Sequence, residues 1–176
     1  AAMHRYYLSL GANLGKREEM LQTAVALLKE QKKLQVTAVS SMYETPPWGK
    51  TDQPVFINMA CTVETALSGQ ELLAICQQIE QTLGRVRHEK WGARTIDIDI
   101  VYSDDVVSHT DTLDIPHPYV TQRAFVLVPL QEIAPNVCLI GQPLSYWLQQ
   151  LPDVQDVKKI CNEYEMTKQR ETTWKK

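Results

Sequence analysis

The chain has 176 residues, a formal net charge of -3 at pH 7, 44% hydrophobic residues and 22% charged residues. These values predict one folded domain and exclude a largely disordered chain, which would combine low hydrophobicity with high net charge. No apolar run approaches the ~20 residues of a membrane-spanning helix, and the mild acidity argues against a general nucleic-acid binder. The four cysteines lie far apart and form no CxxC pair, which predicts reduced thiols in a cytoplasmic protein.

Hydrophobic periodicity predicts an order of elements that begins β-α-β-β-α-β. Ser68 and Glu71 form a capping box that opens the second helix, and Gly84 is its expected C-terminal stop. The predicted strands are 6–10, 36–43, 57–63 and 95–102, and the predicted helices are 16–33, 68–83 and 143–151, with mixed helical and loop signals at 121–133.

This order is typical of an α+β, ferredoxin-like core, in which a mainly antiparallel sheet has helices packed on one face. The later segments are C-terminal additions to that core. We place a single domain at residues 3–151 and expect residues 152–176 to form a polar, weakly ordered tail.

The strongest chemical signal is the strand that contains Asp97 and Asp99. Alternate residues of a strand share a face, so the two carboxylates project together while the intervening isoleucines point into a core. Carboxylates are the usual protein ligands of Mg²⁺, which completes its shell with phosphate and water. Residues 85–94 carry four Lys or Arg against one Glu, whereas residues 97–114 carry six Asp and no Lys or Arg. Such a pattern is typical of nucleotide-dependent phosphoryl transfer, although the chain has no P-loop.

A second group of candidates surrounds the double-proline segment 45–49. The prolines hold this backbone rigidly, so that its carbonyl and N–H groups can act as fixed hydrogen-bonding edges. Trp48, Phe56 and Phe125 can stack on a flat heterocycle, and the Asn58 amide can both donate to it and accept from it. Each residue alone also has a structural explanation, since Trp48 can cover a core edge and Asn58 can cap a turn.

A third group follows Ile115-Pro116, where His117 is flanked by prolines and Arg123 lies a few residues downstream. A rigidly held histidine can present one ring nitrogen to a phosphate or a ribose. An isolated surface histidine is the alternative.

Together these residues resemble the 6-hydroxymethyl-7,8-dihydropterin pyrophosphokinase family of folate biosynthesis. The resemblance covers about residues 5–150. It depends on the runs Ser9–Leu14, Tyr43–Pro47, Asp52–Pro54, Gly84–Arg87, Trp91–Ile100 and Ile115–His117, and on Phe56, Asn58, Arg123 and Phe125. The resemblance implies transfer of pyrophosphate from ATP to the hydroxymethyl group of the pterin, release of AMP, and two bound Mg²⁺ ions per site.

The resemblance also implies the following contacts. The catalytic residues would be Asp97, Asp99, Arg87 and Arg94, and the first two would also bind both metal ions. The pterin would contact Thr45, Pro46, Trp48, Phe56, Asn58, Trp91 and Phe125. ATP would contact Gln77, Glu80, Arg87, Lys90, Trp91, Arg94, Ile100, His117 and Arg123. A mobile loop at 84–92 would close over both substrates. The chain departs from the pattern of some members at Lys90, Thr112 and Pro118, which replace Arg, Arg and Tyr.

Two other functions fit parts of the sequence. A ferredoxin-like RNA-binding module would carry a Lys/Arg-Gly-Phe/Tyr run on a strand, and the sequence has none. A two-metal phosphohydrolase would use the same carboxylates with water as the nucleophile, but it has no need of the cluster at 45–58. The Asp pair alone also fits a solvated polar stripe. We therefore expect a monomeric, cytoplasmic enzyme that uses ATP and the pterin, with no nucleic-acid or membrane partner.

Overall fold

The computed structural model describes residues 2–13, 16–46, 55–86 and 96–160. Its centre is an antiparallel sheet with the order β10-β3-β4-β1-β5, in which β2 also pairs with β4. The strands of this sheet are β1 (His4–Ala12), β2 (Leu34–Val39), β3 (Tyr43–Thr45), β4 (Phe56–Thr65), β5 (Ile96–Ser103) and β10 (Lys158–Lys159). The helices are α1 (Arg17–Glu30), α2 (Gly69–Val86), α3 (Ala124–Ile133) and α4 (Leu144–Gln149), with 3₁₀ turns η1 (Val120–Gln122) and η2 (Val154–Asp156).

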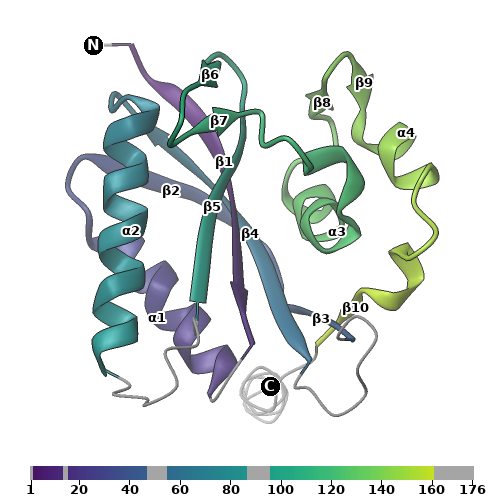
Figure 1. Cartoon of the computed structure of the whole chain (residues 1–176), viewed down its shortest axis with the longest axis horizontal. Helices are drawn as coiled ribbons and strands as arrows, with labels where there is room; N and C mark the ends of the chain where they lie inside the picture. Colours follow the sequence, from purple (N-terminus) through teal and green to yellow (C-terminus); the bar gives the residue numbers. More distant parts are fainter. Residues whose placement is uncertain (1, 14–15, 47–54, 87–95, 161–176) are drawn as a thin grey trace, which may run out of the picture.

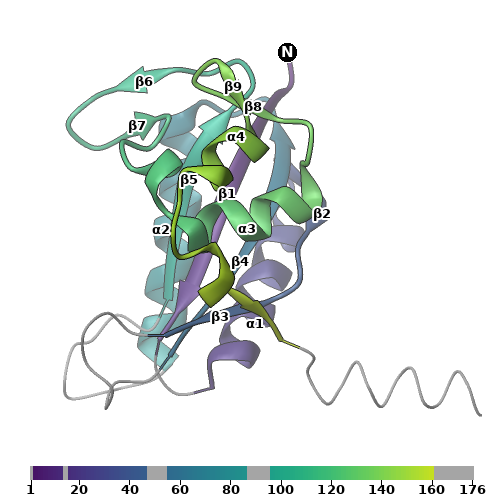
Figure 2. The ribbon, with the colours of Figure 1, turned by 90° about the vertical axis from the view of Figure 1, so that its right-hand side faces the viewer.

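The four long strands have the expected ferredoxin-like arrangement, because β5, β1, β4 and β2 follow one another with antiparallel pairing throughout. This result confirms the predicted α+β class. The helices, however, cover both faces of the sheet and not one. Figure 1 shows α1 and α2 on one side of the strands and α3 and α4 on the other, and Figure 2 shows α3 crossing in front of the sheet.

The second helical layer follows from the central strand. Strand β4 is buried from Ile57 to Val63 without interruption, so it has apolar side chains on both faces. Cys61 packs in the core beneath α1 and α2, whereas Ala60 packs in the core beneath α3 and α4. A strand that is buried on both faces needs a covering layer on each side.

Several boundaries differ from the sequence predictions. The capping box is confirmed, since Ser68 N donates to Glu71 Oε1 at 3.0 Å and Glu71 N donates to Ser68 Oγ at 3.2 Å. Gly84 lies inside α2 and does not end it. The strand expected at 36–43 is divided into β2 and β3, and both parts pair with β4.

The segment after Leu151 adds structure to the sheet. Val157 is buried in a small cluster with Tyr43 and Ala124, and β10 then pairs with β3. The backbone N–H of Ile160 donates to Met42 O at 2.9 Å, so the pairing extends one residue further. Two hairpins, β6 (Ser108–His109) with β7 (Asp114–Ile115) and β8 (Cys138–Leu139) with β9 (Gln142–Pro143), were not predicted.

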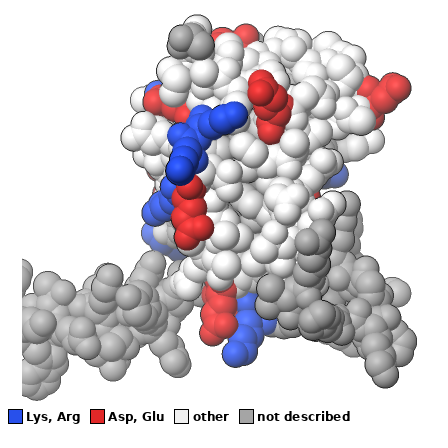
Figure 3. Space-filling model, turned by 90° about the vertical axis from the view of Figure 1, so that its left-hand side faces the viewer, with Lys and Arg blue, Asp and Glu red and all other residues white. Residues whose placement is uncertain are grey.

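The outer face over α1 and α2 carries scattered charges on a largely uncharged surface (Figure 3). The exposed stripe of α2 explains part of this, because Gln70, Ala74, Gln77, Gln78 and Gln81 are all uncharged. Within the described ranges, the helices are too short or too polar to span a membrane.

Candidate active site

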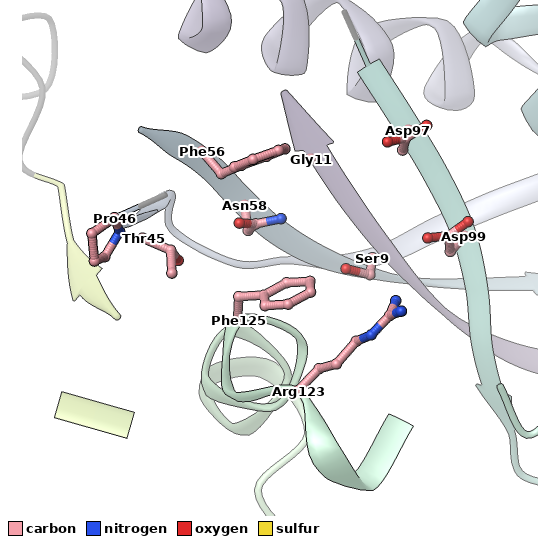
Figure 4. Close-up of a pocket in the computed structure, with 10 residues that line it drawn as sticks. All are labelled: Ser9, Gly11, Thr45, Pro46, Phe56, Asn58, Asp97, Asp99, Arg123 and Phe125. Carbon is pink, nitrogen blue, oxygen red and sulfur yellow. The ribbon is translucent and has the colours of Figure 1, made fainter. Parts of the chain in front are cut away.

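A cavity of about 430 Å³ opens on the α3 side of the sheet, where the ends of four strands meet the start of α3. Figure 4 shows side chains from the sheet and from the start of α3 facing one another across it. The lining residues are Ser9, Gly11, Thr45, Pro46, Phe56, Asn58, Asp97, Asp99, Arg123 and Phe125. Eight of these ten were predicted as site residues, and they come from four separate segments of the chain.

Strand register explains why these residues meet. Gly11 on β1 pairs with Asp97 on β5 and with Asn58 on β4, and Asn58 in turn pairs with Tyr43 on β3. Directly paired residues of an antiparallel sheet lie side by side on the same face. The cavity floor is therefore a row of paired residues across four strands. The carboxylate of Asp97 lies at one end of this row, and the double-proline segment lies close to the other end.

One half of the cavity has buried polar atoms that lack a protein partner. Within the described part of the chain, Thr45 Oγ1 and Asn58 Oδ1 are buried and accept no hydrogen bond. Burying a polar atom without a partner is costly, so such atoms point to a ligand that supplies the missing bonds. Phe56 and Phe125 line the same half and present aromatic surface to it. This half is suited to a flat heterocycle with polar edges.

The other half carries the predicted acidic pair. Asp97 and Asp99 project from the same face of β5 into the cavity, while Ile96 and Ile98 are buried beneath the helices (Figure 4). A rise of about 3.3 Å per residue places the two Cα atoms about 7 Å apart. This spacing allows both carboxylates to act on a single bound polyanion and its cations.

Arg123 supplies positive charge beside the acidic pair. Its guanidinium carbon lies 5.2 Å from the centre of the Tyr119 ring and 5.7 Å from the centre of the Phe125 ring. These cation–π contacts hold the side chain so that it extends toward Ser9 and Asp99 (Figure 4). An arginine held in this way can bind a phosphate group in the cavity.

His117 lies beside this half of the cavity and is held through its backbone and its ring. Its N–H donates to Val101 O at 2.9 Å, and its Nδ1 accepts the backbone N–H of Tyr119 at 3.1 Å. Partial burial, together with the charge of Arg123, lowers the pKa of His117 below its ordinary value, although Asp99 and Asp114 oppose this effect. The neutral ring therefore carries its proton on Nε2, which is available to donate to a ligand.

Three predicted ATP contacts lie at the β5 edge of the sheet and not in the cavity lining. Glu80 Oε2 accepts the backbone N–H of Ile98 at 3.0 Å, which fixes α2 to this edge. Gln77 is exposed one helical turn earlier on α2. The side chain of Ile100 is buried in the core, so only its backbone atoms can reach a ligand.

Several predicted residues cannot be placed, and two lining residues were missed. Trp48, Arg87, Lys90, Trp91 and Arg94 lie outside the described residues, as does most of the expected loop at 84–92. Ser9 and Gly11 were not predicted as site residues, and the predicted first strand ends at residue 10, before Gly11. The structure places it inside β1, where a glycine marks a close approach of the neighbouring chain.

Comparison with known proteins gives a consistent assignment. The sequence pattern of the "7,8-dihydro-6-hydroxymethylpterin-pyrophosphokinase (HPPK)" family matches residues 7–135. The "2-amino-4-hydroxy-6-hydroxymethyldihydropteridine pyrophosphokinase" of Methylorubrum extorquens is 44% identical over 149 residues, which cover 85% of this chain and 94% of that protein. The protein of the same name from Bacillus subtilis is 48% identical over 131 residues, which cover 74% of this chain and 78% of that protein.

Solved structures agree at the level of the fold. A Plasmodium falciparum HPPK-DHPS crystal structure aligns with a TM-score of 0.67 at 17% identity and covers 85% of this chain. This chain spans 43% of that one, which is less than half of its length. The chain thus belongs to the 7,8-dihydro-6-hydroxymethylpterin-pyrophosphokinase family, and it is an enzyme that transfers pyrophosphate from ATP to 6-hydroxymethyl-7,8-dihydropterin in folate biosynthesis.

Proposed function

We propose that the two halves of the cavity divide the two substrates between them. The pterin lies in the half formed by Thr45, Pro46, Phe56, Asn58 and Phe125, and the triphosphate of ATP lies beside the acidic pair and Arg123. The observation that carries this proposal is the pair of buried, unpartnered oxygens, Thr45 Oγ1 and Asn58 Oδ1. The amino and ring N–H groups of a pterin supply the donors that these two acceptors lack.

The donor set of the acidic half fits Mg²⁺. Asp97 and Asp99 present two carboxylates to one cavity, and the described residues contain no cluster of three or more His, Cys, Asp or Glu side chains. A site with two protein carboxylates leaves most of the coordination shell to phosphate oxygens and water, which is the preference of Mg²⁺. We infer that these two residues hold two Mg²⁺ ions. When bound, Mg²⁺ neutralises charge on the triphosphate and makes the substrate hydroxyl easier to deprotonate.

The residues of the chain then have distinct parts in the reaction. The pterin hydroxyl oxygen forms a bond to the β-phosphorus of ATP, the bond between that phosphorus and the α–β bridging oxygen breaks, and AMP leaves with the bridging electron pair. Asp97, at the end of the row that contains Asn58, accepts the hydroxyl proton. Arg123 binds phosphate oxygens, and the Nε2–H of His117 donates to the nucleotide. Holding the two substrates in line is the largest part of such catalysis.

Four residues outside the described ranges complete the proposal as predictions. Arg87, Lys90 and Arg94 are proposed to bind phosphate groups, and Trp91 is proposed to cover both substrates. Gln77, Glu80 and the backbone of Ile100 are proposed to bind the nucleotide at the β5 edge. The predictions of a cytoplasmic monomer with no nucleic-acid or membrane partner, and of Trp48 as a pterin contact, also stay predictions.

The experiment that tests the assignment separates transfer from hydrolysis. The protein is incubated with ATP, Mg²⁺ and 6-hydroxymethyl-7,8-dihydropterin, and the products are separated by chromatography. We expect AMP and the pterin pyrophosphate in equal amounts, and neither product without the pterin. Release of ADP or free phosphate alone, at a rate independent of the pterin, contradicts the proposal and favours the phosphohydrolase.

A substitution in the pterin half tests where that substrate lies. Thr45→Val removes the hydroxyl but keeps the shape of the side chain, so the variant retains the fold. We expect the KM for the pterin to rise about tenfold, as for the loss of about 1.4 kcal/mol, while the KM for ATP changes little. An unchanged KM for the pterin would place this substrate elsewhere.

A further inference from the structure

The wall of the pterin half that is formed by β3 is short and lies near the edge of the sheet. Strand β3 has only three residues, Tyr43–Thr45, and it leads directly into Pro46 of the cavity. Its neighbours are β4 on one side and the two-residue strand β10 on the other. So short a strand needs contacts beyond its ladder to hold a fixed position.

Glu132 supplies such contacts from the opposite layer. Its carboxylate accepts three hydrogen bonds, from Tyr43 Oη at 2.5 Å, from Ser41 N at 2.8 Å and from Ser41 Oγ at 3.2 Å. Tyr43 is buried, and its phenol is held near Glu132 within the cluster that includes Ala124 and Val157. Both ends of this hydrogen-bonded group are thus attached to rigid elements, β3 and α3.

The same helix also forms the opposite wall of the pterin half. Phe125 lines the cavity and Glu132 follows it by seven residues, which is two helical turns and places both on the same face of α3. Tyr43 and Thr45 likewise share a face of β3, since they are two residues apart. The bond between Glu132 and Tyr43 therefore joins the two walls, one of which carries Phe125 and the other Thr45.

The charge states of Glu132 and Tyr43 are consistent with a hydrogen bond between them that persists in the working enzyme. Burial raises the pKa of Glu132, but the hydrogen bonds from Tyr43 and Ser41 outweigh it and hold the pKa below its ordinary value. Burial and the same bond raise the pKa of Tyr43 well above its ordinary value. Glu132 is thus ionised and Tyr43 protonated at neutral pH, which is the state that gives a charge-assisted hydrogen bond.

We propose that Glu132 is a positioning residue for the pterin: through Tyr43 and Ser41 it fixes β3, and so Thr45, at the distance from Phe125 that the heterocycle needs. This inference depends on the proposed place of the pterin in the cavity. The C-terminal segment also helps to hold β3, because Lys159 of β10 pairs with Tyr43. Lys159 lies beyond the residues matched by the family pattern, 7–135. Misplacing a substrate by about 1 Å costs an enzyme up to about a hundredfold in rate. Hydrogen bonds outside the cavity, such as those of Glu132, can therefore govern binding within it.

The test uses two conservative variants, Tyr43→Phe and Glu132→Gln, and their combination. We expect each single variant to raise the KM for the pterin by about tenfold and to leave the KM for ATP within about twofold of the original. Because both changes weaken the same hydrogen bond, the double variant should have a KM for the pterin close to that of the more impaired single variant, and not one that combines the two effects. Equal increases in both KM values, or a lower Tm with both KM values unchanged, would overturn the proposal.

The chain contains a matched control on the same face of the sheet. Tyr7 is also buried and donates from Oη to a carboxylate, that of Asp104, at 2.9 Å. This pair lies outside the cavity lining. Tyr7→Phe removes the same kind of bond, so we expect a lower Tm with an unchanged KM for the pterin. If Tyr7→Phe raised that KM as Tyr43→Phe does, the effect would be one of general stability and the proposal would fall.

A fourth variant separates this inference from the one on which it depends. Asn58→Ala removes a proposed direct contact to the pterin. An increased KM for the pterin in Asn58→Ala with none in Tyr43→Phe overturns the positioning role alone. An unchanged KM in Asn58→Ala overturns the place assigned to the pterin, and the positioning role with it.

Discussion

Gly11 and Asn58 lie directly opposite each other on β1 and β4, and a Cβ atom at residue 11 would come within 2.7 Å of Asn58 Nδ2. No side chain tolerates so close a contact. The Asn58 amide can therefore occupy its position only because residue 11 has no side chain. The buried amide oxygen of Asn58 is one of the two unpartnered acceptors of the cavity. A glycine in the middle of a strand, which weakens the strand itself, is thereby explained by the site.

The first prediction concerns Gly11→Ala. The nearest atom is the end of a side chain and not backbone, so we expect the variant to fold with the Asn58 amide displaced. The KM for the pterin should rise about tenfold or more, which corresponds to at least about 1.4 kcal/mol, and the KM for ATP should stay nearly constant. Steady-state kinetics with each substrate varied in turn measures both. Gly141→Ala is the control, since its φ of 78° strains an alanine in a turn whose residues do not line the cavity; a similar rise in the KM for the pterin in that variant would contradict the steric explanation.

The second prediction concerns the acidic pair. Asp97→Asn keeps the size of the side chain but removes a charge and a proton acceptor, so we expect kcat to fall at least about a hundredfold. Asp99→Asn removes charge but not the proposed acceptor, so we expect more Mg²⁺ to be needed for half-maximal rate. Chelation of Mg²⁺ should abolish pyrophosphate transfer by the unchanged protein and leave its circular dichroism spectrum intact.

Asp104→Asn is the control for these two variants, because Asp104 accepts a hydrogen bond from Tyr7 outside the cavity. Its kcat and its dependence on Mg²⁺ should match those of the unchanged protein. If Asp97→Asn transferred pyrophosphate at nearly the original rate, both the metal-ligand role and the proton-acceptor role of Asp97 would be wrong.

Local patterns predicted the parts of the fold that local chemistry determines. The capping box at Ser68 and the alternation around Asp97 and Asp99 each involve residues within a few positions of one another, and both are present. The antiparallel order of the four long strands followed from the sequence of elements. The same reasoning placed Asn58 and Phe125 in one proposed site, and both line the cavity.

The parts that were missed depend on contacts between distant residues. Strand β10 has two residues and exists because Lys159 meets Tyr43, so no periodicity in residues 152–160 could have predicted it. Tyr43 and Glu132 are 89 positions apart, and neither lies in a pattern that indicates the other. The predicted first strand stops at residue 10 because glycine is common in turns, whereas the pairing of Gly11 with Asn58 continues β1 past it.

The third prediction concerns the titration of His117. Its pKa lies below the ordinary value of 6.5, because of partial burial and the charge of Arg123. The folded chain therefore binds this proton more weakly than the unfolded chain does. The resulting contribution to stability is complete above about pH 6.5 and is lost as the pH falls through the folded pKa. NMR of the imidazole nitrogens should show a neutral ring at pH 7 that is protonated on Nε2.

The variant Arg123→Ala tests the cause. Removal of the positive charge should raise the pKa of His117 toward its ordinary value, although burial keeps part of the shift. A pKa at or above 6.5 in the unchanged protein, or a ring proton on Nδ1, would contradict the assigned tautomer and with it the proposed donor to the nucleotide.

The fourth prediction concerns Ile140 in the turn between β8 and β9. Ile140 has φ of 49° and Gly141 has φ of 78°, so both residues of this two-residue turn are left-handed. The hairpin favours that geometry, but a β-branched residue is strained in it, and 58% of Ile140 is exposed. We expect Ile140→Asn to add about 1 kcal/mol to the free energy of unfolding, which raises Tm by about 2–4 °C, without a change in kinetics. Calorimetry measures the difference, and Gly141→Ala should lower Tm in the same experiment. A lower Tm in Ile140→Asn would show that the isoleucine side chain contributes more through its contacts than its backbone conformation costs.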